Sequence, residues 1–304
     1  MGRRLLVLVN RAAGTTDDDS VEAAVAALGR GAEVTVAATA DLAELRTAVS
    51  GLGDRRPVVI GGDGSVHAAV QALDRAGVLH PSVPVGVIPR GTGNDLAGTL
   101  GLPPDPVEAV AAVLDGTPRP LDLVRDDAGG LVVNAVHVGV GALAAAEALR
   151  FKERLGTVAF PLGAAIAGTT ASGWALRVEV DGRVPVHSGE GWAADGSNDV
   201  LMLAVCTGRT IGGGAPLAPD ALVDDGLAEV VISTATGPVA RAAFAAALVT
   251  GRHVDRPDVL VTRGREVTFS GPPVDLNADG DIEQDVGSRT WRVERHAWSV
   301  LVPT

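Results

Sequence analysis

Two glycine-rich segments combine flexible backbone with polar side chains suited to phosphate and metal chemistry. Residues 61–65 read Gly-Gly-Asp-Gly-Ser, and residues 91–95 read Gly-Thr-Gly-Asn-Asp. Glycine lets a phosphate approach the backbone closely, and successive backbone N–H groups in such a turn bind anions. Asp63 would repel a bare phosphate, so its carboxylate indicates a Mg²⁺ ion between them. The alternative for residues 61–65 is a tight turn held by an aspartate hydrogen bond, without a ligand.

Both segments follow short apolar runs that we predict to be buried strands. Strands are expected at residues 5–9, 34–38, 57–60 and 83–88, with helices at 21–28, 42–52 and 66–73. Alternating strands and helices indicate a parallel sheet that is covered on both faces. Ligands bind such sheets at the carboxyl ends of the strands, where residues 10–14, 61–65 and 89–95 lie.

The pattern changes after about residue 124. Short β-like runs at 132–138, 175–180, 200–206, 228–233, 259–262, 266–269 and 291–293 are mostly separated by turn residues. They predict a mostly antiparallel second domain. We therefore expect an α/β domain at residues 1–124, a β-rich domain at 125–290 and a C-terminal segment, 291–304, that rejoins either domain. An uncharged stretch at 155–176 has the length of a membrane span, but its glycines and hydroxyl residues favour a buried or interface-facing helix.

Composition narrows the classes of function. Hydrophobic residues make up 46% of the 304 residues, which is enough for a folded core. The net charge of −12 argues against a nonspecific nucleic-acid binder, which would carry a basic stripe. Cys206 is the only cysteine, so no intrachain disulfide or thiolate metal cluster can form, as fits a reducing cytoplasm.

The glycine segments do not match the phosphate loop of P-loop kinases, and no Gly-x-Gly-x-x-Gly follows the first strand. Residues 60–68 and 87–96 instead resemble the diacylglycerol-kinase catalytic family, which includes bacterial lipid kinases and is related to sphingosine and ceramide kinases. That family has Gly-Gly-Asp-Gly-Thr or Ser, followed by Pro-x-Gly-Thr-x-Asn-Asp, and both stand here at the expected separation. Asn10 and Gly14 resemble its first-strand loop, although Arg11 replaces the usual proline.

The resemblance implies a Rossmann-like ATP-binding domain and a β-sandwich lipid domain, with ATP as phosphoryl donor and Mg²⁺ as cofactor. The segment Asp224-Asp225-Gly226-Leu227 resembles one that binds Mg²⁺ in bacterial members, which maps the metal onto Asp225 and the main chain of Leu222 and Leu227. The residues expected to contact ATP are Asn10, Gly14, Thr39, Gly61, Gly62, Asp63, Gly64, Ser65, Val66, His67, Gly91, Thr92, Asn94 and Asp95.

The catalytic base is expected in a third motif. Asp279-Gly280-Asp281 stands where the family has Asp-Gly-Glu, so both Asp279 and Asp281 are candidates. Aspartate is one methylene shorter than glutamate, which matters if Asp281 must reach a substrate hydroxyl. Residues 275–281 also fit the start of a calcium-binding EF-hand loop, but Val286 stands where that loop needs glutamate.

We therefore predict an ATP-dependent kinase that phosphorylates diacylglycerol or a similar lipid alcohol. The protein is expected in the cytoplasm, with transient peripheral contact with the inner membrane face and no nucleic-acid partner. Phosphofructokinases and NAD kinases share a Gly-Gly-Asp-Gly loop, so a kinase of a sugar or nucleotide is one alternative. A nucleotide- or calcium-binding regulator without catalysis is the other. His67 is a candidate γ-phosphate contact, whereas His137 is expected to be a satisfied core histidine.

Overall fold

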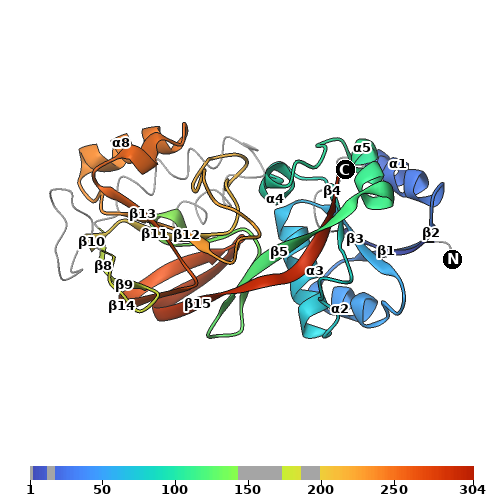
Figure 1. The fold of residues 1–304 in the computed structure, drawn as a ribbon, viewed down its shortest axis with the longest axis horizontal. Coiled ribbons are helices and arrows are strands. Elements are labelled where there is room, and N and C mark those ends of the chain that lie inside the picture. The colour runs from blue at the N-terminus through green and yellow to red at the C-terminus, as the bar shows by residue number, and fades with distance from the viewer. Residues whose placement is uncertain (1–2, 12–17, 143–172, 186–198) are drawn as a thin grey trace. The chain divides into compact units, whose positions relative to one another are not determined.

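A four-stranded parallel sheet forms the first part of the chain (Figure 1). The computed structural model describes residues 3–11, 18–142, 173–185 and 199–304. The strands are β1 (Arg4–Asn10), β2 (Glu33–Thr39), β3 (Arg56–Gly61) and β4 (Gly86–Pro89). Their order is β2-β1-β3-β4, and every neighbouring pair is parallel. This confirms the predicted parallel sheet, with strand bounds shifted by one to three residues.

Helices cover both faces of this sheet (Figure 1). They are α1 (Asp18–Gly29), α2 (Leu42–Ser50), α3 (Asp63–Arg75), α4 (Asp95–Thr99) and α5 (Pro106–Asp115). On one face, Leu5, Val7 and Ile60 pack against Leu28 of α1 and Val110 of α5. Helices α2 and α3 lie on the opposite face. Because both faces are buried, the strands are continuous apolar runs rather than alternating ones.

The end of the chain returns to this first unit. The backbone N–H of Val85 donates to Ser299 O at 2.9 Å, and the N–H of Leu301 donates to Val85 O at 3.0 Å. Trp298 is fully buried, and its indole N–H donates to the backbone oxygen of Asp122 at 3.2 Å. Contacts accordingly divide the chain into one unit of residues 1–122 and 296–304 and a second unit of residues 123–295.

The second unit is built on an antiparallel sheet. Its strands are β6 (Leu131–Val132), β7 (Ala135–Gly139), β8 (Trp174–Ala175), β9 (Arg177–Val180), β10 (Asp199–Val200), β11 (Met202–Cys206), β12 (Ala228–Ser233), β13 (Val259–Gly264) and β14 (Glu266–Ala278). Two further strands, β5 (Thr117–Asp126) and β15 (Asp281–Val302), contribute residues to both units. Nine strands form one sheet in the order β13-β12-β11-β7-β14-β15-β5-β6, with β9 beside β14, and β8 pairs with β10 separately.

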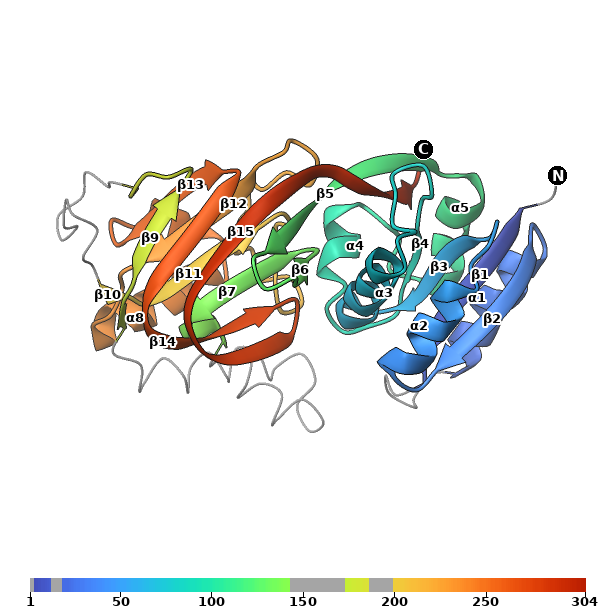
Figure 2. The same cartoon turned by 90° about the horizontal axis from the view of Figure 1, so that it is seen from below.

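One apolar cluster shows how this sheet builds a core. Val230 of β12 and Leu260 of β13 share the cluster with Trp291 of β15 and Val124 of β5, from the other end of the strand order. The sheet therefore curls so that one face packs on itself (Figure 2). Phe269 stacks on Trp291 within it, with ring centroids 5.6 Å apart.

Two features differ from the sequence-based expectations. The runs at 266–269 and 291–293 belong to one long hairpin, β14–β15, whose register shifts between Ser270 and Val274, where two prolines stand. Helix α8 (Pro238–Leu248) and the 3-10 turn η2 (Arg252–Asp255) were not anticipated. Of the uncharged stretch at 155–176, residues 155–172 lie outside the described part of the chain. Among the described residues, no helix is long and apolar enough to span a membrane.

Candidate functional site

The carboxyl ends of the four parallel strands bring the glycine segments together. The chain runs from β1 outward to β2 and then returns to β3 on the other side of β1. A change of direction of this kind leaves a crevice between the two strand ends, which is where open α/β sheets bind ligands. Asn10 ends β1 and is paired with Thr39, while Gly61 ends β3 and is paired with Pro89. The described members of the predicted ATP set therefore lie along or just beyond one edge of the sheet.

The first glycine segment leads directly into helix α3. Gly62 is the N-cap residue, and no side chain caps this helix end. The first backbone N–H groups of an uncapped helix and its partial positive charge form an anion-binding site. Gly61 has no room for a side chain, because an added Cβ would lie 2.5 Å from the Cβ of Ser65. Gly61 is buried against Ser65, whereas Gly62 is partly buried and Gly64 is exposed, so a ligand would reach this turn at Gly62–Gly64.

The second glycine segment packs directly on the first. An added Cβ at Gly91 would lie 2.8 Å from the Cα of Gly62, and the N–H of Arg90 donates to Gly61 O at 2.9 Å. Asn94 adopts the left-handed conformation, with φ of 54°, and its side-chain amide donates to Gly91 O at 2.8 Å. The two turns thus form one backbone-lined surface in which only glycine fits at the point of contact.

Asp63 joins the two segments. Its Oδ2 accepts from the backbone N–H of Asp95 at 3.0 Å, and its Oδ1 accepts from that of Leu96 at 3.2 Å. The carboxylate therefore caps helix α4 from a position 32 residues away in sequence. The sequence suggested a metal or a local aspartate turn for Asp63, and the structure instead gives its carboxylate a contact between the loops. Asp95 is itself buried, at 6% exposure.

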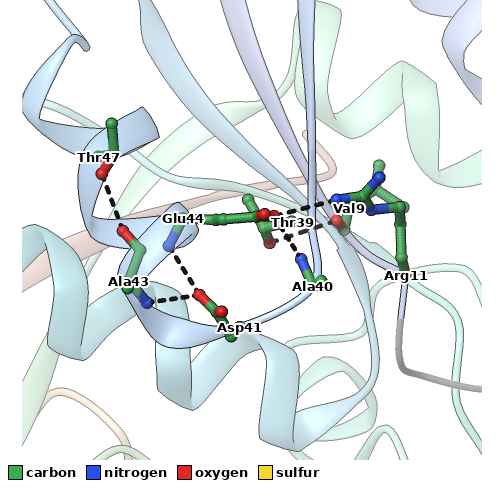
Figure 3. Close-up of polar contacts among 8 residues, drawn as sticks. All are labelled: Val9, Arg11, Thr39, Ala40, Asp41, Ala43, Glu44 and Thr47. Atoms are coloured by element: carbon green, nitrogen blue, oxygen red, sulfur yellow. Dashed lines mark hydrogen bonds and ion pairs between the residues drawn. The ribbon is translucent and has the colours of Figure 1, made fainter.

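A third loop borders the edge beside β1 (Figure 3). Arg11 forms an ion pair with Glu44 Oε2 at 3.0 Å, and the same oxygen accepts from the N–H of Ala40 at 2.8 Å. Asp41 caps α2 by accepting from the N–H groups of Ala43 and Glu44, each at 2.9 Å. Arg11, which departs from the family pattern, therefore ties the end of β1 to helix α2. No local sequence pattern predicts this contact, because Arg11 and Glu44 are far apart along the chain.

A small cavity of about 230 Å³ lies beside the ends of β1 and β2 and the first part of α3, and residues 91–95 do not line it. Its polar lining comes from Asn10, Thr39, Asp41 and Ser65, which lie in or just after β1 and β2 and in the first turn of α3. The rest of the lining is apolar and comes from Leu8, Val9, Ala40, Leu42, Leu45, Val59, Ala68 and Ala69. Its mixture of apolar side chains and a few polar groups is that of a small-molecule site, although its volume is below the range of about 300–1,000 Å³ usual for such sites.

The other residues predicted to contact ATP differ in exposure. Val66 and His67 are buried, at 3% and 4% exposure, and the His67 ring hydrogen bonds with Gln71 Nε2 at 3.0 Å. The His67 ring is therefore part of the buried side of α3, and its contact with the γ-phosphate stays a prediction. Thr92 is exposed at the tip of the second segment. Gly14 lies outside the described residues.

The two candidate bases have different surroundings. Asp279 and Gly280 form a two-residue hairpin turn with φ of 51° and 104°, the conformation of an Asp-Gly type I′ turn. The Asp279 carboxylate accepts from three backbone N–H groups, those of Val133 at 2.5 Å, Asn134 at 3.0 Å and Ala135 at 2.9 Å. Asp279 therefore fixes the turn to β7, whereas the side chain of Asp281 is exposed.

The calcium-loop alternative for residues 275–286 is wrong. These residues pair as the antiparallel hairpin of β14 and β15, with Asn277 opposite Ile282 and Ala278 opposite Asp281. Asn277 Oδ1 accepts from the N–H of Gly280 at 2.9 Å, so the amide closes the turn. An EF-hand would require helices on both sides of the loop.

The residues predicted to bind the metal form a turn before β12. Asp225 Oδ1 accepts from the N–H of Leu227 at 3.0 Å, and Oδ2 pairs with the guanidinium of Arg263. Leu222 lies three residues earlier and is 39% exposed. Within the described part of the chain, no group of three or more His, Cys, Asp or Glu side chains could hold a metal ion.

Two buried titratable side chains lie in the second unit. Burial lowers the pKa of His137 to about 4, so its ring is neutral at pH 7. The core position of His137 is as expected, but its Nδ1 has no hydrogen-bond partner among the described residues. Burial raises the pKa of the Cys206 thiol, which keeps it protonated and unreactive, as expected for a core cysteine.

Comparison with known proteins finds two family matches that follow each other along the chain. The family described as diacylglycerol kinase catalytic domain matches residues 4–125. The family described as YegS C-terminal NAD kinase beta sandwich-like domain matches residues 134–302.

Curated relatives carry related names. A "Probable lipid kinase YegS-like" protein of Stenotrophomonas maltophilia is 33% identical over 78% of this chain and 74% of its own length. One of Xanthomonas campestris is 32% identical over 92% of this chain and 90% of its own. A "Diacylglycerol kinase" of Mycobacterium tuberculosis is 28% identical over 80% and 75%.

Solved structures have the same fold. A crystal structure of a diacylglycerol kinase from Bacillus anthracis superimposes with a TM-score of 0.71 at 16% identity, covering 99% of this chain and 97% of that one. A second structure from that organism has a TM-score of 0.79 at 18% identity, with the same coverage. Together with the two matched domains and the curated relatives, the fold leads to one conclusion: this chain belongs to the YegS-like family of lipid kinases, which pairs a diacylglycerol kinase catalytic domain with a β-sandwich-like domain.

Proposed function

We propose that this protein transfers the γ-phosphoryl group of ATP to the hydroxyl of diacylglycerol or a similar lipid alcohol. ATP binding is supported by the contact between Gly62 and Gly91 at the carboxyl ends of the parallel strands, which Asp63 holds in place. A surface of backbone N–H groups at a helix N-terminus suits the β- and γ-phosphates. The lipid acceptor is supported by the names of the relatives.

Each unit has its own part in the proposed reaction. In the first unit, the uncapped end of α3 and the 91–95 turn hold the phosphates, and the cavity beside Thr39 takes another part of the nucleotide. Mg²⁺ arrives with ATP and neutralises phosphate charge. Both Asp63 oxygens already accept backbone amides, so we assign Asp63 to positioning the loops. In the second unit, exposed Asp281 accepts the proton of the acceptor hydroxyl, and Asp279 holds the turn in place.

The direct experiment measures ADP release with Mg²⁺-ATP in mixed micelles with and without diacylglycerol. We expect release to rise with diacylglycerol and phosphatidic acid to appear in equal amount. Sugar alcohols and NAD⁺ serve as parallel acceptors at matched concentration. If one of these acceptors stimulates ADP release and no lipid alcohol does, the proposed lipid acceptor is wrong and the proposed use of ATP is unaffected. ATP binding without turnover on any acceptor would support a regulator instead.

The role of Asp63 predicts a specific pattern for Asp63→Ala. Two hydrogen bonds to backbone amides disappear, so we expect a loss of about 1–3 kcal/mol in the free energy of unfolding. We also expect ATP turnover to fall by about 10²-fold or more, since the phosphate loops lose their fixed geometry.

Asp105→Ala is the matched control for Asp63→Ala. Asp105 also accepts two backbone amides, from Val107 and Glu108, but it caps α5. We expect Asp105→Ala to cost about 1 kcal/mol of stability and to leave turnover close to that of the unaltered protein. Equal turnover in the two variants would remove Asp63 from the active site.

The assignment of the base predicts different results for the two aspartates. Asp281→Asn is expected to lower lipid phosphorylation by about 10²-fold or more with ATP affinity unchanged, because general-base assistance is lost. Asp281→Glu restores the family residue and is expected to retain activity.

Two other substitutions separate catalysis from structure. Asp279→Asn is expected to lower stability, since it removes part of the charge that three amides contact. Asp285→Asn, at an exposed position on the same strand, is the matched control and should leave both activity and stability unchanged. Full activity of Asp281→Asn would transfer the role of base to another residue.

A lipid acceptor also requires contact with a membrane, and helix α8 offers a surface for it. Val239, Ala242, Ala246 and Val249 recur at helical spacing and are all exposed, Val239 at 84% and Val249 at 70%. Phe244 faces the core instead, at 4% exposure. A helix on a protein surface normally turns polar residues outward. We propose that this stripe lies on the bilayer during transient contact of a cytoplasmic protein with the inner membrane face.

The stripe predicts how membrane binding responds to substitution. Val239→Gln with Val249→Gln should lower binding to neutral phosphatidylcholine vesicles that contain diacylglycerol by about tenfold, which corresponds to about 1.4 kcal/mol of lost apolar burial. Val36→Gln, at a valine 46% exposed on β2, is the control. Sedimentation with vesicles measures binding, and turnover on a short-chain soluble diacylglycerol should stay unchanged. Equal sedimentation of all three proteins would rule out α8 as the contact.

A further inference from the structure

In the turn before β12, the carboxylate of Asp225 pairs with the guanidinium of Arg263. Asp225 is followed by Gly226, whose φ of +81° allows the sharp turn into Leu227. The first carboxylate oxygen of Asp225 accepts from the N–H of Leu227 at 3.0 Å. The second pairs with the terminal nitrogen of Arg263. Both oxygens of the only carboxylate assigned to the metal therefore face hydrogen-bond donors.

The position of Arg263 is set by the sheet. Arg263 lies on β13 directly opposite Glu229 of β12 in the antiparallel ladder. Its Nε is 3.7 Å from Glu229 Oε2, so one guanidinium lies between two carboxylates. Glu229 is 3% exposed, and burial raises its pKa while Arg263 lowers it. A buried carboxylate needs a nearby cation to remain ionised, and a guanidinium can bond two carboxylates at once.

The same residues do not fit Mg²⁺. That ion requires near-octahedral oxygen ligands at about 2.0–2.1 Å and is held through carboxylates whose electron pairs point at it. Here each carboxylate oxygen of Asp225 already accepts a hydrogen bond, one from a backbone N–H and one from a guanidinium. The side chain of Arg295 also packs over the turn, since an added Cβ at Gly226 would lie 2.9 Å from its Cδ. Two arginines therefore border the position at which a cation was expected.

We infer that Arg263 supplies the positive charge at the Asp225 turn and that this chain holds the turn without a metal ion. The guanidinium is fixed by strand register, so the turn and the start of β12 keep their geometry at any Mg²⁺ concentration. The only Mg²⁺ requirement left to the protein is then the ion that accompanies ATP. This inference concerns the second unit alone and stands whether or not the proposed acceptor is correct.

The test uses the full chain without nucleotide and compares thermal unfolding in EDTA with unfolding in millimolar Mg²⁺. We expect the unaltered protein to have the same midpoint temperature in both. Arg263→Ala should unfold at a lower temperature in EDTA and recover part of the loss in Mg²⁺, because its two carboxylates are released. Arg265→Ala, an exposed arginine two residues further along, should behave like the unaltered protein.

Two results would overturn the inference. One is a midpoint of the unaltered protein that falls in EDTA, returns with Mg²⁺ and loses this response in Asp225→Asn. The other is an Arg263→Ala variant as stable as the Arg265→Ala control. If Arg263→Ala does not fold, Mn²⁺ binding followed by electron paramagnetic resonance decides the matter. The unaltered protein and Asp225→Asn should bind equal amounts of Mn²⁺, and a bound ion lost in Asp225→Asn contradicts the role of Arg263.

Discussion

The hydrogen bonds that the Asp63 carboxylate accepts from the first backbone N–H groups of α4 are the constraint on which the two glycine turns depend. Two turns that approach as closely as Gly62 and Gly91 have no side chains with which to hold each other. A carboxylate from the first turn of α3 supplies that connection and satisfies two helix-end donors at once. The negative charge of Asp63 is thereby directed at backbone amides, which leaves the adjacent uncapped N-terminus of α3 for an anion.

Other aspartate carboxylates along the chain also accept hydrogen bonds from backbone N–H groups at turns. Asp279 accepts three amides at the hairpin that presents Asp281, and Asp181 accepts the N–H groups of Arg265 and Glu266. Asp126 accepts two amides within the turn between β5 and β6. Asp63, Asp126, Asp181 and Asp279 therefore each fix a turn or a helix end by accepting backbone N–H groups. Arg263 beside Asp225 extends this pattern, since the carboxylate there has an amide and a guanidinium as partners.

The sequence was sufficient for the parts of the fold that depend on periodicity and glycine. Continuous apolar runs that end in polar glycine segments predicted the parallel sheet and the edge at which residues 61–65 and 91–95 meet. The short β-like runs after residue 124, mostly separated by turn residues, predicted the antiparallel unit. Contacts between distant residues could not be predicted this way. Neither the bond from Asp63 to α4 nor the pairing of Arg263 with Asp225 has a local pattern, because each depends on how separate strands and loops come together. The burial of His67 could not be predicted for a related reason, since only packing decides which side of α3 is buried.

Hydrogen–deuterium exchange with and without Mg²⁺-ATP is the measurement that most directly tests whether ATP binds at the carboxyl ends of the parallel strands. Binding of the phosphates to the paired turns should slow exchange in residues 61–66 and 91–96 together, because Asp63 makes them one structural element. The hairpin at residues 276–283 should exchange at the same rate in both conditions. Slowed exchange confined to other parts of the chain, with residues 61–66 and 91–96 unchanged, would contradict the placement of ATP at this edge.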